Sequence, residues 1–209
     1  MKNVLKNLKN YVMKKKLIKV AKKTTKVKQV KRNPYFLDLA CGNNKQIGAT
    51  GVDIVKKGTQ ADIELDLLKF PWPFKDNSIK KIFCSHFIEH IPHGDSFNDP
   101  LYQFMDEIYR ILKPGGDVTF VAPYYTSQRA FQDPTHHRSI GEATFLYFQK
   151  PWRKLNKLEH YPVKCNFEVV AMNHAISEEM NGKPQEAIMY NGMHFWNIIN
   201  DLVIVLKKK

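Results

Sequence analysis

Short apolar runs separated by polar turns dominate the middle of the chain and predict strands. Residues 35–40 (Tyr-Phe-Leu-Asp-Leu-Ala) and 51–54 (Gly-Val-Asp-Ile) are mainly apolar, and each run carries one acid. Residues 61–67 alternate between polar and apolar positions, residues 79–84 form a fourth run, and residues 117–125 contain a fifth. Runs of this length, bounded by turn residues, are typical of buried strands.

One amphipathic helix is predicted between the fourth and fifth runs. Asp99 is a favourable N-cap, and Pro100 suits the first helical turn. The apolar face comprises Leu101, Phe104, Met105, Ile108, Ile111 and Leu112. A turn at residues 113–116 (Lys-Pro-Gly-Gly) ends the helix. Because strands and connections alternate in this way, the sequence predicts an α/β fold with a mainly parallel sheet.

The rest of the body is expected to complete this sheet. Residues 166–176 and 201–206 supply two late strands, which we expect to form an antiparallel pair. Residues 68–78 contain two prolines, which exclude a regular element there. Residues 207–209, three lysines, are expected to form a solvated tail.

The first 32 residues differ in charge from the rest of the chain. They contain thirteen of the 33 basic residues and no acid, so the remainder, with 20 basic and 20 acidic residues, is formally neutral. Apolar residues recur at helical spacing through residues 2–23, which predicts an amphipathic basic helix. Asn33-Pro34 breaks this pattern and divides the chain into an N-terminal arm, residues 1–33, and a body, residues 34–209.

Such an arm could bind the phosphates of a nucleic acid, lie on an anionic membrane surface, pack on the body or stay solvated. Lysine dominates the arm and Tyr11 is its only aromatic residue, so it lacks the stacking surface of a single-strand binder.

Composition argues against several classes of protein. No apolar run approaches the roughly 20 residues of a membrane span, so we expect no transmembrane segment. Lysines interrupt the N-terminal apolar residues, which argues against a signal peptide. Cys41, Cys84 and Cys165 have no Cys-x-x-Cys spacing, which argues against a disulfide framework or a cysteine zinc site. We therefore expect a cytoplasmic protein.

Acidic residues recur near the ends of the first three predicted strands. Asp38, Asp53 and Asp66 stand near the carboxyl ends of strands that we expect to be parallel, where a crevice suits a small polar ligand. There Asp53 would accept from two ribose hydroxyls, and Asp38 could hold a cationic amino group. The turn at residues 41–44 (Cys-Gly-Asn-Asn) lacks the glycine pattern of a pyrophosphate site. A nucleoside without phosphate is therefore favoured, and an ordinary loop is the alternative.

Further motifs follow these acids in a fixed order. The series is Asp38-x-x-x-Gly42, Asp53, Asp66, Phe74-x-Asp76-Asn77-Ser78, Glu89-His90-Ile91 and Leu112-Lys113-Pro114-Gly115-Gly116. In order and spacing it resembles the small class I methyltransferases that use S-adenosylmethionine, such as those of the ubiquinone pathway, although Asn43 and Asn44 depart from their glycine pattern. The resemblance implies a Rossmann-like seven-stranded sheet, mainly parallel, with an antiparallel last strand. It also implies a methyltransferase domain over residues 34–209 with a substrate insert at about residues 126–163.

The same resemblance implies roles for individual residues. Asp38 and Gly42 would border the methionine part of the cofactor, and Ser85 its carboxylate and sulfonium. Asp53 would take the ribose hydroxyls, and Asp66 with Leu67 would meet the adenine. The full set implied for S-adenosylmethionine is Asp38, Ala40, Gly42, Asp53, Ile54, Asp66, Leu67 and Ser85.

Histidines cluster where the acceptor would bind. If the acceptor is a hydroxyl, a base must take its proton, and His86 or His136 is the candidate catalytic residue. Some family members carry Glu-x-x-Glu-His at this point and bind a divalent metal. Here the candidate metal ligands are His86, Glu89, His90 and His136, and the alternative is that Glu89 and His90 only start a helix and pack. Tyr124 and Tyr125 are expected to wall the acceptor pocket.

Three functions remain open from the sequence. The favoured one is methyl transfer from S-adenosylmethionine to a small molecule or a glycan. A nucleic-acid methyltransferase that uses residues 1–32 for phosphate contacts is one alternative, and a non-catalytic binding or structural subunit with the same fold is the other. The acceptor and the oligomeric state lie beyond the sequence.

Overall fold

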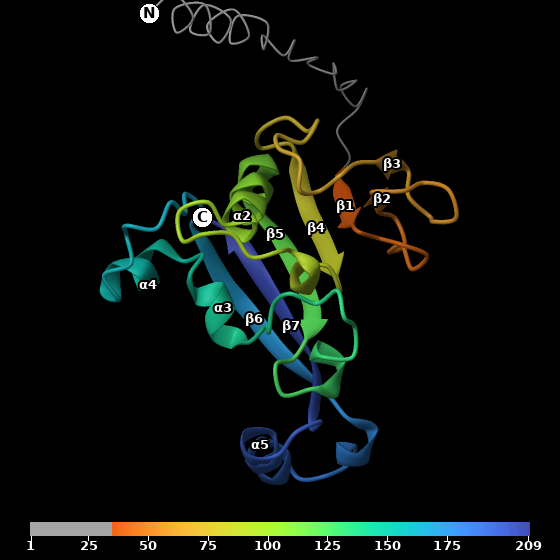
Figure 1. Ribbon diagram of the computed structural model, residues 1–209, viewed down its shortest axis with the longest axis vertical. Coiled ribbons are helices and arrows are strands. Elements are labelled where there is room, and N and C mark those ends of the chain that lie inside the picture. The colour runs from red at the N-terminus through yellow and green to blue at the C-terminus, as the bar shows by residue number, and fades with distance from the viewer. Residues whose placement is uncertain (1–34) are drawn as a thin grey trace, which may run out of the picture.

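The computed structural model describes residues 35–209, which form one seven-stranded sheet (Figure 1). The strands are β1 (Phe36–Leu39), β2 (Thr50–Asp53), β3 (Ile63–Glu64), β4 (Ile79–Ser85), β5 (Leu112–Pro123), β6 (Phe167–Ile176) and β7 (Ile199–Lys208). Their order across the sheet is β3-β2-β1-β4-β5-β7-β6. Strands β1 to β5 pair in parallel, and β7 is antiparallel to both β5 and β6. The predicted α/β sheet with an antiparallel last strand is therefore confirmed, whereas the helix expected in residues 2–23 lies outside the described residues.

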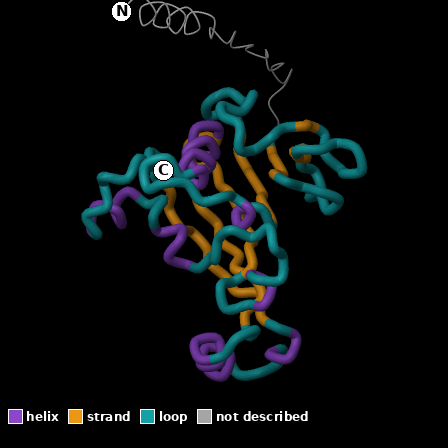
Figure 2. Tube along the Cα trace, viewed as in Figure 1, coloured by secondary structure: helices purple, strands orange, loops and turns teal. Residues whose placement is uncertain are grey.

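Two of the helices pack on one face of this sheet. The longer helices are α2 (Pro100–Ile111), α3 (Glu142–Leu146), α4 (Lys150–Leu155) and α5 (Gln185–His194), and single turns are η1 (Ile88–His90), η2 (Gln128–Ala130) and η3 (Glu178–Met180). Phe120 of β5 lies between Phe104 of α2 and Phe145 of α3, at ring-centroid distances of 6.5 and 5.5 Å. The structure describes every residue between β1 and β4, and the connections there are loops without a helix (Figure 2).

Strand register aligns the buried side chains of this helix-covered face. Leu39 pairs with Cys84, Cys84 with Phe120, and Phe120 with Ile204, and all four are at most 1% exposed. Burial of such side chains contributes about 1.5–3 kcal/mol each, so a one-residue slip, which would turn them to the other face, is strongly disfavoured.

Two predicted strand boundaries differ from the observed ones. The predicted strand 61–67 shortens to Ile63–Glu64. Before it, the Asp62 carboxylate accepts from Gly51 N of the neighbouring strand, and after it the Asp66 carboxylate accepts from Leu68 N and makes a local turn. Strand β5 begins at Leu112, so the turn at residues 113–116 becomes an irregular start of the strand, with a shift of register opposite Ile79 and Lys81.

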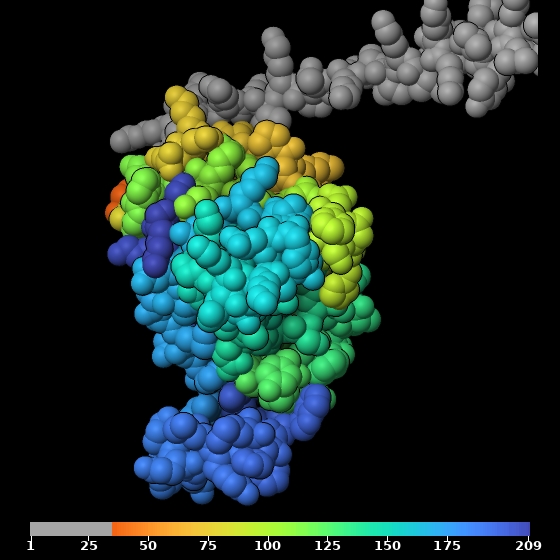
Figure 3. Space-filling view, turned by 90° about the vertical axis from the view of Figure 1, so that its left-hand side faces the viewer, coloured from red at the N-terminus to blue at the C-terminus, as the bar shows by residue number. Residues whose placement is uncertain are grey.

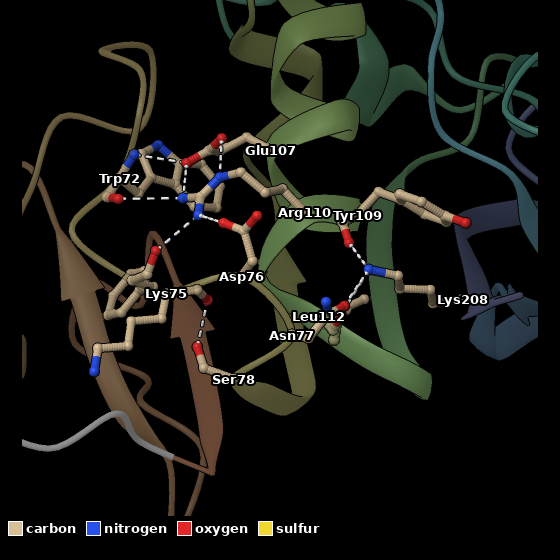
Figure 4. A network of polar contacts seen from close by, with 11 residues as sticks. Trp72, Lys75, Asp76, Asn77, Ser78, Glu107, Tyr109, Arg110, Leu112 and Lys208 are labelled. Carbon is tan, nitrogen blue, oxygen red and sulfur yellow. Dashed lines mark hydrogen bonds and ion pairs between the residues drawn. The ribbon is translucent and has the colours of Figure 1, made fainter.

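The expectation of a solvated lysine tail is wrong for Lys208. Its side chain is buried, and its ammonium donates to Asn77 Oδ1 at 2.8 Å, Tyr109 O at 2.6 Å and Leu112 O at 2.9 Å (Figure 4). Burial lowers the pKa of this ammonium. Three acceptors satisfy its three donors, so Lys208 connects β7 to the end of α2 and to the loop before β4.

Arg110 of α2 holds the proline-containing loop in place (Figure 4). Its guanidinium donates to the Glu107 carboxylate at 2.9 and 2.5 Å, to Asp76 at 2.5 Å, and to the carbonyl oxygens of Phe74 and Trp72 at 2.9 and 3.2 Å. Glu107 also accepts from Trp72 N at 2.6 Å. The irregular segment predicted for residues 68–78 therefore has a defined path beside the strand ends.

Substitution Arg110→Met should destabilise the fold by about 3 kcal/mol, because it leaves the buried Glu107 carboxylate without its cationic partner. Chemical denaturation of the full chain measures this. The matched control is Lys209→Met, which removes a half-exposed ion pair of 3.6 Å with Glu168 and should cost less than about 0.5 kcal/mol. Equal losses in the two variants would contradict the role assigned to Arg110.

Candidate functional site

Polar residues gather at the carboxyl ends of the parallel strands. Asp38 lies in β1, Asp53 ends β2 and Ser85 ends β4, and Leu39 pairs with both Val52 and Cys84. This register brings the three polar residues to one edge of the sheet, as the sequence predicted. Asp66 lies two residues beyond β3 at the same edge.

The turn after β1 leaves open space at Gly42. Ala40 and Gly42 both have positive φ, at 54° and 50°, and Gly42 N donates to Asp53 Oδ2 at 2.9 Å. A Cβ added at Gly42 would meet no heavy atom within 4 Å. A bound molecule can therefore approach this backbone closely, and the carboxylates of Asp38 and Asp53 suit the amino group and ribose hydroxyls of a nucleoside joined to an amino acid.

Asp38 is a buried carboxylate at the base of this space. It is 2% exposed and accepts from Gln46 N at 2.7 Å through Oδ2. Burial raises the pKa of Asp38, and the Gln46 N–H and the charge of Lys45 act in the opposite direction. Its remaining oxygen is available to a cationic or hydrogen-bond-donating ligand group.

The other predicted cofactor residues line the edge on the side of β2 and β3. Ile54 is 62% exposed directly after β2. Asp66 Oδ1 accepts from Leu68 N at 3.0 Å, and Asp66 Oδ2 pairs with Lys69 at 3.2 Å. The carbonyl of buried Leu67 accepts from Trp72 Nε1 at 3.2 Å, which fixes the loop that follows.

The segment after β5 folds back onto η1. The carbonyl of Glu89 accepts from the backbone N–H groups of His137 and Arg138, at 2.8 and 3.1 Å. As a result the rings of His90 and His136 lie 4.6 Å apart. Ligand atoms of Glu89, His90 and His136 lie within 4.8 Å of one another, so the structure brings together three of the four candidate metal ligands. The fourth, His86, contacts Glu89, with Nδ1 3.3 Å from Oε1.

Glu89 is the most unusual side chain of this cluster. It is 1% exposed, and neither of its carboxylate oxygens has a hydrogen-bond partner among the residues that the structure describes. The 3.3 Å contact of Oε1 with His86 Nδ1 is therefore the nearest partner of this carboxylate. A buried carboxylate with so few partners is costly, and such groups concentrate at functional sites. The neighbouring Glu89 carboxylate raises the pKa of His86 against the opposing effect of burial, and the charge of Asp201 adds to the rise.

Arg129 and Asp201 lie beside His86 and were not among the site residues predicted from the sequence. Arg129 Nη1 donates to Asp201 Oδ2 at 2.7 Å, whereas Asp201 Oδ1 is buried and has no hydrogen-bond partner in residues 35–209. Burial raises the pKa of Asp201, and the charges of Arg129 and His86 lower it. The sequence feature that could have indicated Asp201 is its position as the only acid in the mainly apolar strand β7.

A family model described as a methyltransferase domain matches residues 14–120, just over half of the chain. The chain belongs to this family. It is an S-adenosylmethionine-dependent methyltransferase of class I, and S-adenosylmethionine is its cofactor. No curated protein sequence matches the chain significantly.

Solved structures support the fold of this methyltransferase. A SAM-dependent methyltransferase from Archaeoglobus fulgidus is 19% identical, with a TM-score of 0.53 over 83% of this chain and 85% of its own. A SAM-dependent methyltransferase from Methanosarcina mazei is 16% identical, with a TM-score of 0.50 over 86% and 94%. A Haloferax volcanii protein solved in complex with the Trm112 methyltransferase activator is 16% identical, with a TM-score of 0.51 over 86% and 83%. At these identities the likeness concerns the fold alone.

Within the residues that the structure describes, no helix has the length and apolarity that crossing a bilayer requires.

The His86–Glu89 pair gives a pH-dependent prediction. An NMR titration should find the pKa of His86 above its usual value in the wild type and lower in Glu89→Gln, because the substitution removes the carboxylate that stabilises the imidazolium. A raised histidine pKa adds stability below about pH 6.5, which is lost as the pH rises through the folded pKa. The difference in unfolding free energy between the two proteins should therefore be larger at pH 6 than at pH 9, and an unchanged His86 titration would contradict the pairing.

Proposed function

We propose that this methyltransferase acts on a small molecule or a glycan at the carboxyl edge of its sheet. The open space at Gly42, between the carboxylates of Asp38 and Asp53, is the observation that carries the placement of the cofactor. The residues assigned to its binding are Asp38, Ala40, Gly42, Asp53, Ile54, Asp66, Leu67 and Ser85.

Each of these residues contributes a separate interaction. The bound cofactor supplies an electrophilic methyl group on a sulfonium. Asp38 holds the amino group of the methionine part, and Asp53, fixed by Gly42 N, accepts from the ribose hydroxyls. Asp66 and Leu67 contact the adenine, and Ser85 lies beside the methionine carboxylate.

Proton removal from a hydroxyl acceptor is assigned to the histidines. His86 is half-exposed directly after β4, and Glu89 orients it and stabilises the imidazolium that forms. His136 is the second candidate. Its Nδ1 lies 3.0 Å from the carbonyl of Ala130, which leaves Nε2 as the free ring nitrogen.

The Gly42→Ala variant tests the cofactor site. Its Cβ would enter the open space, so the affinity for S-adenosylmethionine, measured by calorimetry, should fall roughly tenfold or more. Gly48→Ala is the matched control, because Gly48 also has a positive φ, 79°, and open space, but no assigned cofactor contact. Both substitutions should cost about 1–2 kcal/mol of backbone strain. Equal cofactor affinity in the two variants would show that the cofactor lies elsewhere.

A divalent cation at Glu89, His90 and His136 is a second candidate, favoured by the buried Glu89 carboxylate, which accepts no hydrogen bond of good geometry from residues 35–209. Two imidazoles and a carboxylate suit zinc, iron or manganese, and His86 would complete the set. Calorimetry with Zn²⁺ should detect binding that His136→Gln weakens roughly tenfold or more. His137→Gln, the exposed neighbour, is the control and should bind like the wild type. Equal binding by both variants would remove the metal from the mechanism.

The acceptor assay separates the remaining functions. Labelled S-adenosylmethionine with fractionated cell extract should label a small molecule or glycan. Labelled nucleic acid, with a steep salt dependence that is lost on deletion of residues 1–32, would instead favour the nucleic-acid enzyme. Cofactor binding without transfer to any fraction would favour a binding subunit. Three free cysteines, all buried, support a reducing compartment, and we assign the protein to the cytoplasm.

A further inference from the structure

The chain between β6 and β7 leaves the sheet and builds one wall of a cavity. Residues 177–198, which include η3 and α5, form a lobe at the lower end of the molecule, joined to the body by a narrow waist (Figure 3). A cavity of about 490 Å³ lies between α5, the second half of β6 and the start of α3. Met193, which lines it, is 73% exposed, so the cavity opens to solvent.

The cavity has an apolar wall and a polar end, where Tyr124 and His174 contact the Glu142 carboxylate. Asn173 and Gln185 also line it. Methionine and isoleucine side chains from β6, α5 and β7 line it, including Met172, Ile188 and Ile199. At its polar end, Glu142 Oε1 accepts from the Tyr124 hydroxyl at 3.0 Å and pairs with His174 Nε2 at 2.7 Å.

Glu142 retains unused capacity to accept hydrogen bonds. Its Oε2 has only a long contact of 3.3 Å with the Tyr124 hydroxyl. Burial raises the pKa of Glu142, but hydrogen bonds from its own N–H, His174 and Tyr124 outweigh burial and hold the pKa below its usual value. The group is therefore ionised at neutral pH, and a carboxylate oxygen has room for further donors.

Charge selects the kind of ligand that this cavity can take. The chain has a net charge of +13, yet no lysine or arginine is among the described residues that line the cavity, and Glu142 is the acid among them. Among the same described residues, His174 is the only other group that could carry a positive charge, and its Nε2 is already engaged with Glu142 Oε1. An anion would therefore face the free Oε2 of Glu142, whereas an ammonium would pair with it. The Tyr124 ring, beside Glu142, adds an aromatic surface that attracts cations.

The cavity lies close to the proposed site of methyl transfer. Ser85 at the end of β4 pairs with Val121 of β5, and Tyr124 follows three residues later. Neighbouring strands lie about 4.8 Å apart and a strand rises about 3.3 Å per residue, so one strand spacing and three residues separate Ser85 from Tyr124 by roughly 11 Å. A ligand of about that length, anchored at Glu142 beside the Tyr124 hydroxyl, reaches toward Ser85.

We propose that this cavity is the acceptor site, and that the acceptor is an organic amine, bound as its cation by Glu142, with an apolar body against the methionines and isoleucines. This inference rests on the proposed function, because it specifies the substrate class of that enzyme. The amine is the anchoring group, and the methylated atom is a different atom of the acceptor, held nearer Ser85.

The test compares three small probes of similar shape on the full chain. Calorimetry with phenethylamine, 2-phenylethanol and 3-phenylpropionate should give at least tenfold tighter binding of the amine. Glu142→Gln keeps the side-chain shape but removes the charge, so it should abolish this preference. Glu186→Gln changes an exposed acid in the first turn of α5 and should leave the preference intact.

A second variant fills the cavity without changing its charge. A Cβ at Gly192 would lie 3.2 Å from Ile199 Cδ1, so the larger side chain of Gly192→Leu occupies the apolar part, and leucine favours the helix. Binding of phenethylamine should fall at least tenfold in this variant.

Each outcome bears on one claim. Equal binding of the three probes, or an amine preference that survives Glu142→Gln, overturns the inference while leaving the cofactor site untouched. Binding of S-adenosylmethionine should persist in Glu142→Gln and be lost in Asp53→Ala. Binding of phenethylamine should be lost in Glu142→Gln and persist in Asp53→Ala. A wild-type chain that binds phenethylamine but not S-adenosylmethionine would overturn the proposed function and keep the amine site.

Discussion

Parallel strand register is the constraint on which the rest of this methyltransferase depends. Leu37 and Leu39 are fully buried on the helix-covered face, which turns Asp38, between them, to the opposite face at the carboxyl edge. A slip of one residue would turn the Asp38 carboxylate to the helix-covered face, among apolar side chains, and both leucines away from that face, at a cost of several kcal/mol. The apolar core therefore fixes the position of the Asp38 carboxylate. It also fixes the positions of Asp53 and Ser85, because β2 and β4 both pair with β1.

The charged residues that are buried or partly buried fall into two groups. One group connects segments of the fold, and the other lies at the carboxyl edge of the sheet. Lys208 and Arg110 find acceptors for their donors and connect segments far apart in sequence. Glu89 and Asp201 instead keep buried oxygens without hydrogen-bond partners among the described residues. An unsatisfied buried polar atom costs about 1–3 kcal/mol, so three such oxygens on these two residues beside His86 indicate groups that are available to a ligand.

The sequence predicted the sheet and its polar edge because both follow from local patterns. Acids at the ends of short apolar runs, and the Leu112-to-Gly116 motif, depend only on neighbouring residues and on the rule that parallel strands share an edge. Lys208 was taken for solvated tail because its three acceptors come from residues 96 to 131 positions away. The Arg129–Asp201 pair was missed for the same reason, since 72 residues separate its members. Contacts of this kind exist only once β7 lies between β5 and β6.

The proposed cofactor and acceptor sites are built by different parts of the chain. Strands β1 to β4 and their loops supply every residue assigned to S-adenosylmethionine and most of the family motifs, and the Leu112-to-Gly116 motif begins β5. The cavity on the other side of β5 is built mainly from connections, since Glu142 begins α3 and α5 belongs to the excursion between β6 and β7. Connections change more freely than strands, because no sheet register constrains them. The family motifs therefore indicate the type of reaction but not the acceptor. The chemistry of the acceptor depends on Glu142, His174 and the apolar wall around them.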